Sequence, residues 1–180
     1  MMPVPDVLPR GSVCLALYPF VPGLPLRQVA ERVDAAGPVV ERHDDLTSLT
    51  AAIPPGAPSA DLVVQFKLRR VLLLQTVRGR RADVVVARIN SVTPDRRERS
   101  GWYLRLTEGR HPAHYLIGRL RRHGSAGREA FVDLMNVTTI RTDVIVSRTG
   151  YLTADEMRDV SERLVRTLEL DISRLVDGGG

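Results

Sequence analysis

The chain has 180 residues, of which 43% are hydrophobic and 26% are charged, and its formal net charge at pH 7 is +5. This composition is that of a globular domain with a core and excludes an intrinsically disordered chain. The single cysteine, Cys14, excludes an intramolecular disulfide and a zinc site built on several cysteines. No apolar run reaches the length of a membrane span, and the first residues do not have the pattern of a signal peptide. We therefore expect a soluble cytoplasmic protein without a membrane partner.

The basic residues are almost all of one kind. Lys67 is the only lysine among 26 basic residues, and the others are arginine. Arginine presents a planar fork of donors that suits phosphate oxygens, so the charge favours a polyanionic partner. A GC-rich genome accounts for much of the preference for arginine over lysine, but it does not account for the excess of positive charge.

The first part of the chain contains one clear strand and a proline-rich stretch. An apolar run at 12–18 follows a turn at 10–11 and predicts a first strand. Residues 19–61 then contain seven prolines and two short helical patterns. One pattern covers 25–37 and the other about 43–53. We interpret 19–61 as an insert with short helices between two core strands.

The centre of the chain has the pattern of a β-hairpin. Residues 62–76 and 83–91 are nearly continuous apolar runs, typical of strands buried on both faces. Residues 77–82 form a glycine-containing connection of hairpin length. The segment 92–129 is polar, rich in arginine and mostly loop-like. Further strands are predicted at 102–106, 114–117, 131–140 and 143–149.

The last part of the chain predicts an amphipathic helix. Residues 153–156 (Thr-Ala-Asp-Glu) form a capping-box pattern, in which Thr153 and Glu156 each satisfy a free backbone amide. We expect a helix from 154 to about 175 that packs on the sheet, with a contact between two copies as the alternative, and a frayed tail at 178–180. Many short strands followed by one such helix predict a small barrel or a strongly bent sheet. The apolar stripe of the helix consists of Met157, Val160, Leu164 and Leu168.

Four segments together resemble the MazF/PemK toxins, in the same order along the chain. Residues 10–13 (Arg-Gly-Ser-Val) are similar to the opening strand of the family, and 69–75 to its Arg-Pro-hydrophobic strand. Residues 85–91, which end in Ile-Asn-Ser, stand where the family has a strand ending in Pro-Ile-Thr-Ser. Residues 132–152, followed by Thr-Ala-Asp-Glu-Met, resemble the closing hairpin and the start of the last helix.

The resemblance implies a mainly β fold with α-helices, an SH3-like small barrel with a C-terminal helix, here with a helical insert. It implies a single domain over 1–177. It also implies the toxin of a toxin–antitoxin system, a metal-independent endoribonuclease that cleaves single-stranded RNA such as mRNA at short sequences. Such an enzyme needs no cofactor, forms a homodimer and is bound by a cognate antitoxin protein.

The resemblance also indicates the site residues. Catalysis in the family depends on an arginine and a threonine, whose places are taken here by Arg69 and Asn90. Arg69 suits the stabilisation of charge on phosphate, because a guanidinium remains protonated and is a poor base. Asn90 can donate a hydrogen bond to phosphate but has no hydroxyl, so the neighbouring Ser91 is a third catalytic candidate. We expect further arginines to bind RNA: Arg70, Arg78, Arg80, Arg81, Arg88, Arg110, Arg121 and Arg122.

Departures from the family pattern keep other functions open. Arg70 replaces a proline, Asn90 replaces the threonine, and residues 136–139 (Asn-Val-Thr-Thr) stand where the family has Gln-Ile-Arg-Thr. A second hypothesis is therefore a barrel without catalysis that binds nucleic acid or a protein target such as DNA gyrase. A third is a regulatory domain in which the insert at 19–61 covers its own groove.

Other polar and aromatic residues have less specific patterns. Two histidines could act as acid and base, but we expect them to be surface-loop histidines. Their spacing matches no zinc pattern. The aromatic residues of the same segment either stack on unpaired bases or anchor the core, and the sequence favours neither. Three aspartates are interpreted as solvated residues at strand ends. The residues concerned are His111, His114 and His123; Trp102, Tyr103 and Tyr115; and Asp83, Asp133 and Asp143.

Overall fold

The computed structural model describes residues 6–20, 26–34, 37–52, 63, 65–79, 81–119 and 129–169. The chain divides into two compact units, the first formed by 1–17 together with 68–180 and the second by 18–67. Whether the two units form a single domain with an insert stays a prediction.

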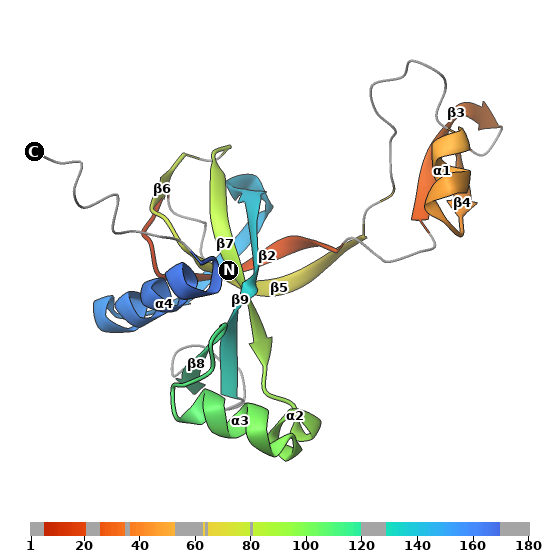
Figure 1. Ribbon diagram of the computed structural model, residues 1–180. Helices are drawn as coiled ribbons and strands as arrows, with labels where there is room; N and C mark the ends of the chain where they lie inside the picture. Colours follow the sequence, from red (N-terminus) through yellow and green to blue (C-terminus); the bar gives the residue numbers. More distant parts are fainter. Residues whose placement is uncertain are drawn as a thin grey trace, which may run out of the picture. The chain divides into compact units, whose positions relative to one another are not determined.

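The first unit is built on a six-stranded sheet with the order β10-β2-β5-β7-β9-β8. Figure 1 labels five of its strands, β2, β5, β7, β8 and β9. Its neighbours β10–β2, β5–β7, β7–β9 and β9–β8 pair antiparallel. A separate two-stranded ribbon pairs β1 (Val7–Leu8) with β6 (Val77–Arg78). Strand β6 lies inside the segment 77–82, which was predicted to be a plain connection. The strands of the sheet are β2 (Ser12–Phe20), β5 (Gln65–Leu73), β7 (Asp83–Ser91), β8 (His114–Arg119), β9 (Glu129–Arg141) and β10 (Ile145–Tyr151), with a short 3-10 turn, η1 (Thr142–Val144), before β10.

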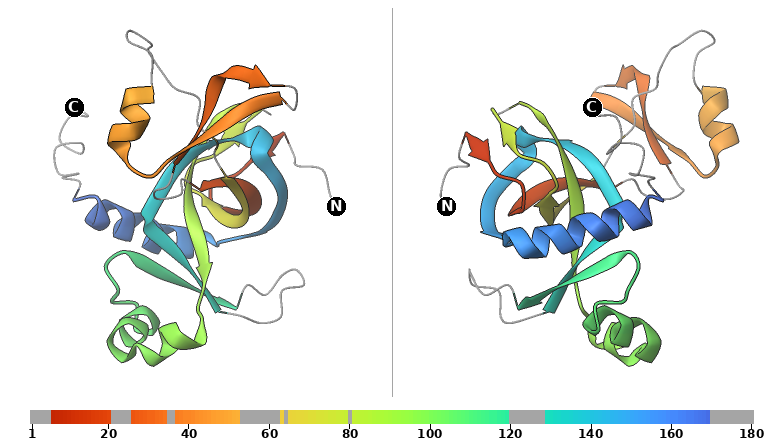
Figure 2. Two further views of the ribbon diagram at one scale, coloured as in Figure 1. Left: turned by 90° about the vertical axis from the view of Figure 1, so that its right-hand side faces the viewer. Right: turned by 60° about the vertical axis from the view of Figure 1, so that its left-hand side comes forward.

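The C-terminal helix α4 (Ala154–Thr167) covers the curved sheet, as Figure 2 shows. Its Met157 and Val160 are buried in one cluster with sheet residues such as Leu72 and Val132. The predicted capping box is present, with hydrogen bonds in both directions between Thr153 and Glu156. The predicted fold class, a mainly β small barrel with a C-terminal helix, is therefore confirmed. The helix ends at Thr167, before the predicted 175, and the tail at 178–180 lies outside the described residues.

The predicted strands at 12–18, 83–91, 114–117, 131–140 and 143–149 are confirmed. The strand predicted at 62–76 is shorter, and its burial on both faces is wrong for its first half. Residues 66–69 are exposed, whereas 71–73 are fully buried. The reason is that β7 pairs only with 70–73 of β5, so residues 66–69 have no part in that pairing.

The segment predicted as loop-like contains two helices, and the strand predicted at 102–106 is wrong. Helix α2 (Pro94–Glu98) begins at a proline in its first turn, where the missing N–H costs nothing. Helix α3 (Ser100–Thr107) follows it. Its Trp102 and Leu106, one helical turn apart, pack against Phe131 of β9. The helical spacing of these two side chains allows that packing, and a strand would turn every second side chain away.

The second unit contains a β-hairpin and a short helix. Strand β3 (Leu26–Asp34) pairs antiparallel with β4 (Gly37–His43), so the helix predicted over 25–37 is wrong. A register shift between Val29 and Val33 breaks the two-residue alternation by which a strand is identified. The second predicted helix is confirmed as α1 (Leu46–Ala52). Hydrogen bonds from Ser48 at its start hold the pKa of the exposed Asp45 below the usual value.

Gly11 occupies a tight turn that glycine alone adopts without strain. Its φ is +85°, and a Cβ there would lie 3.0 Å from Met157 Cγ. We expect Gly11→Ala to lower the free energy of unfolding by about 1–3 kcal/mol, because the left-handed backbone and the crowding both disfavour a side chain. Urea denaturation followed by circular dichroism measures the change. Gly150→Ala, whose added methyl meets nothing within 4 Å, is the control and should change it by less than about 1 kcal/mol. Equal losses in the two variants would contradict this account.

Candidate functional site

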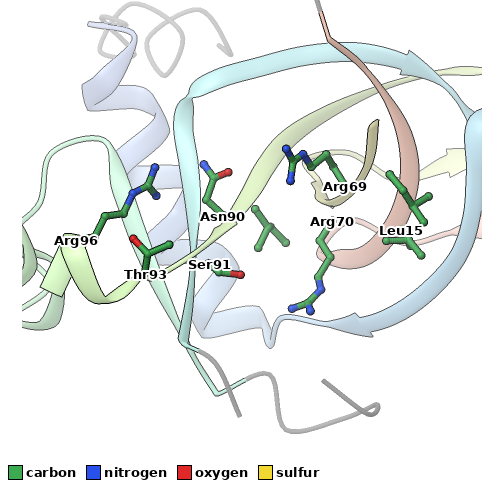
Figure 3. Close-up of a pocket in the computed structure, with 9 residues that line it drawn as sticks. Leu15, Arg69, Arg70, Asn90, Ser91, Thr93 and Arg96 are labelled. Carbon is green, nitrogen blue, oxygen red and sulfur yellow. The ribbon is translucent and has the colours of Figure 1, made fainter. Parts of the chain in front are cut away.

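A pocket of about 610 Å³ opens between β5 and the end of β7 (Figure 3). It brings two arginines of β5 next to polar residues of β7 that lie about twenty positions later in the sequence. The antiparallel pairing of these strands, with Arg70 opposite Ile89, produces this arrangement. The lining residues are Leu15, Leu68, Arg69, Arg70, Ile89, Asn90, Ser91, Thr93 and Arg96.

All three predicted catalytic residues line this pocket, as does one predicted RNA-binding residue, Arg70. Successive residues of a strand point to opposite faces, yet both Asn90 and Ser91 line the cavity. Ser91 is the last residue of β7, where the chain leaves the sheet. Sequence reasoning missed Thr93 and Arg96, which belong to the cap and body of α2. The Thr-Pro pair at 93–94, an ordinary start signal for a helix, would have indicated that a helix begins there.

The pocket is strongly positive. Figure 3 shows Arg69, Arg70 and Arg96 at its edges. Among the residues that the structure describes, none of these three guanidinium groups forms an ion pair with a carboxylate. Like charges held close together favour an anion between them, and a guanidinium can bridge two phosphate oxygens. The arrangement is therefore suited to a phosphate group.

Asn90 is held in one orientation by Asp133 of the neighbouring strand β9. Its Nδ2 donates to Asp133 Oδ2 over 3.1 Å. An ionised carboxylate only accepts hydrogen bonds, so the amide nitrogen has to face Asp133. The carbonyl oxygen of Asn90 then points into the pocket (Figure 3). Asn90 thus presents a hydrogen-bond acceptor to the pocket, whereas the sequence predicted a hydrogen-bond donor.

Asp133 is buried and accepts hydrogen bonds from several side chains. Its interpretation as a solvated strand-end residue is therefore wrong. It is 6% exposed and lies within β9. Its Oδ2 also accepts from Arg88 Nη2 at 3.1 Å and from Asn136 Nδ2 at 2.8 Å. Burial by itself raises the pKa of Asp133, but contacts with His114, Asn136 and Arg88 outweigh it and hold the pKa well below the usual value. The group is a carboxylate at neutral pH.

The other predicted RNA-binding arginines that the structure describes do not line this pocket, called the arginine pocket below. Arg88 is opposite Asp133 in the β7–β9 pair and is bonded to it, with 29% of its side chain exposed. Arg78 lies on β6 and Arg81 in the turn after it, and neither lines the pocket. Arg110 is exposed and pairs with Glu108. Three others lie outside the described residues: Arg80, Arg121 and Arg122.

Two of the histidines form a stacked pair near α3. Their ring centroids are 4.1 Å apart, and His114 lies on β8, whereas a surface loop was expected. His114 Nδ1 accepts from Trp102 Nε1 at 3.1 Å, and His111 Nδ1 accepts from the backbone amides of 113 and 114. Burial and neighbouring positive charges lower the pKa of His111 to about 4. The Nδ1 lone pair of each ring thus already accepts a hydrogen bond, which argues against general-base action by that nitrogen. His123 lies outside the described residues.

The sequence left open whether the aromatic residues anchor the core or stack on unpaired bases, and the structure separates them. Tyr115 packs against the core cluster, and its ring lies 5.4 Å from the Arg163 guanidinium. Tyr103 donates to Glu129 Oε2 over 2.9 Å, which raises its pKa. Both anchor the fold. Trp102 is half-buried and lines a second pocket.

Within the described ranges, no group of three His, Cys, Asp or Glu side chains could hold a metal ion. No described helix is both long and apolar enough to cross a membrane.

Neither a protein-family model nor a curated protein matches this sequence. Among solved structures, the chain is similar to the Mycobacterium tuberculosis toxin MazF-mt6. The two share 19% identity over 58% of this chain and 90% of the toxin, with a TM-score of 0.41. A likeness at this level decides neither activity nor partners.

Proposed function

We propose that the chain is a metal-independent endoribonuclease that cuts single-stranded RNA, and that it is the toxin of a toxin–antitoxin system. The observation that carries the proposal is the convergence of Arg69, Arg70 and Arg96 on one pocket beside Asn90 and Ser91. The sequence resemblance to MazF/PemK toxins, which indicates Arg69 and Asn90 independently of their positions in the fold, supports the same function.

Cleavage would use the ribose 2′-hydroxyl as the nucleophile. Its oxygen bonds to the adjacent phosphorus while the bond from phosphorus to the 5′-oxygen breaks, giving a 2′,3′-cyclic phosphate and a 5′-hydroxyl. Because no lining side chain is a base, the hydroxyl proton passes to solvent water, and the leaving 5′-oxygen takes up a proton from water. Arg69 and Arg70 stabilise the added negative charge on the phosphate oxygens. The Asn90 carbonyl accepts a hydrogen bond from the 2′-hydroxyl and orients it, and the hydroxyl of Ser91 donates to phosphate.

The proposal includes the partners that the resemblance implies, a second copy of the chain and a cognate antitoxin. It also includes a cytoplasmic location. An antitoxin that inhibits by covering this pocket would need acidic side chains, because Arg69, Arg70 and Arg96 would otherwise be buried without partners.

A second candidate function is binding to nucleic acid or to a protein target, such as DNA gyrase, without cleavage. The pocket lining supports it, since none of the nine lining residues is an aspartate, glutamate or histidine. Phosphate binding needs only the positive charge, whereas proton removal from a hydroxyl needs a base.

The two functions are separated by one assay. Purified protein is incubated with a pool of long unstructured RNAs in the presence of EDTA, and the ends of the products are mapped. We expect cuts at a short recurring sequence, with 2′,3′-cyclic phosphate ends, at a rate that EDTA does not change. RNA that is bound but stays intact over the whole incubation would overturn the nuclease and favour the binding module.

A further inference from the structure

A second pocket of about 270 Å³ shares Arg96 with the arginine pocket. Its wall combines aromatic rings, positive charge and one buried carboxylate. The side chains come from α2, from the residue between α2 and α3, from α3, and from β8 and β9. They are Arg96, Arg99, Trp102, His114, Phe131 and Asp133.

The aromatic rings of this second pocket meet edge to face. The centroids of Trp102 and Phe131 are 5.2 Å apart, with 73° between the ring planes. The Arg96 guanidinium lies 5.0 Å from the Phe131 ring and 5.9 Å from the Trp102 ring. A planar cation in that position occupies a place where a flat base can also stack. The shape and the aromatic wall of this pocket therefore suit a flat, electron-poor group.

Asp133 gives the second pocket an acceptor that lacks a close donor. Its Oδ2 takes the three hydrogen bonds already described, while Oδ1 is buried and has no hydrogen-bond partner among the described residues. His114 Nε2 lies 3.5 Å from Oδ1. A buried acceptor left in this way costs free energy, which a ligand N–H would recover.

We propose that the second pocket binds one unpaired nucleobase of an RNA strand whose phosphate lies among Arg69, Arg70 and Arg96. The inference rests on the proposed function for its ligand, RNA, but not on cleavage. The base stacks on Trp102 and Phe131, and the Arg96 guanidinium moves from the rings to the phosphate.

The chemistry of Asp133 also predicts which bases are preferred. Cytosine, adenine and guanine carry an exocyclic amino group that can donate to a carboxylate. Uracil offers a single N–H between two carbonyl oxygens, which a carboxylate repels. We infer a preference for amino-bearing bases over uracil in this pocket.

The test uses the only tryptophan of the chain, Trp102, as its reporter. The full chain is titrated with 2′-O-methyl pentamers of cytidine, adenosine or uridine and with an abasic pentamer of the same charge. These probes lack the nucleophilic hydroxyl, so binding is measured whether or not the protein is a nuclease. We expect the cytidine and adenosine pentamers to quench Trp102 fluorescence and to bind about tenfold more tightly than the uridine and abasic pentamers.

Variants connect this preference to the second pocket. Trp102→Leu and Arg99→Ala should each weaken binding of the labelled cytidine pentamer about fivefold to tenfold, measured by fluorescence anisotropy, and leave the abasic pentamer nearly unchanged. Arg99 is exposed, so its replacement keeps the test valid even if Trp102→Leu is unstable. The control is Arg158→Ala, an exposed position on α4 outside both pockets.

Equal affinity for the cytidine and abasic pentamers, or no quenching of Trp102 at saturation, would overturn the base pocket. If that happens while Arg69→Ala still weakens every pentamer, the phosphate site stands without the base site. A preference for cytidine combined with intact natural RNA would instead support the base pocket and overturn the nuclease.

Discussion

Arg69→Ala is expected to lower the rate of RNA cleavage about 10²–10³-fold, the usual cost of removing one group that stabilises transition-state charge. Arg69 lies on the exposed part of β5 and lines the arginine pocket. Its guanidinium forms no ion pair with another described residue, so its removal leaves no described carboxylate without a partner. Single-turnover cleavage of a fluorogenic RNA that contains the mapped cut site measures the effect.

Two further variants show whether the loss of cleavage rate comes from the guanidinium group of Arg69. Arg69→Lys keeps the charge but loses the two parallel donors, so its cleavage rate should lie between those of the wild type and Arg69→Ala. Arg158→Ala removes an exposed arginine of α4 and should keep the full rate. Thermal unfolding should be the same for all of them. If Arg69→Ala cleaves as fast as Arg158→Ala, the pocket is not the catalytic site.

Asp133→Ala is expected to lower the free energy of unfolding at pH 7 by about 3 kcal/mol, because it leaves the half-buried Arg88 without its carboxylate. It also removes the acceptor of Asn90 and Asn136. The partial exposure of Arg88 places the loss at the low end for a broken buried pair. Urea denaturation measures it. Asp143→Ala, which breaks the exposed pair with Arg141, is the matched control and should cost less than about 1 kcal/mol.

The loss from Asp133→Ala should also depend on pH. The folded pKa of Asp133 lies below its unfolded value of about 3.9, so its ionisation stabilises the fold fully above that value. As the pH falls from about 4 toward the lower folded pKa, this stabilisation is lost. The difference between wild type and Asp133→Ala should therefore shrink between pH 7 and pH 3. A difference that stays constant over that range would show that Asp133 does not act as a buried carboxylate.

Local patterns in the sequence predicted the elements that depend on near neighbours. The capping box at 153–156 and the apolar stripe after it predicted the start of α4, because both signals involve residues within one or two turns. The apolar runs at 12–18 and 83–91 predicted β2 and β7 for the same reason. Where pairing overrides the local pattern, the prediction failed, as in β3, whose apolar spacing resembles that of a helix.

The candidate site was only partly readable from the sequence. Arg69 and Asn90 were indicated by resemblance and Ser91 by its place next to Asn90, and all three line one pocket. Arg96 was missed because its place depends on α2, which the sequence was taken to lack. Asp133 was misread because its burial depends on β8 and β7 on either side of β9, and no residue near it in sequence reveals that.

The sequence by itself thus determined the excess of arginine, most strands of the large sheet, the terminal helix and the three candidate catalytic residues. The tertiary structure decided which of these groups meet. Hydrophobic period and helix caps act over a few residues, whereas a contact such as that of Asn90 with Asp133 depends on the register between two strands 43 positions apart. A shift of one residue in that register would turn Asp133 to the other face and leave both Asn90 and Arg88 without their acceptor.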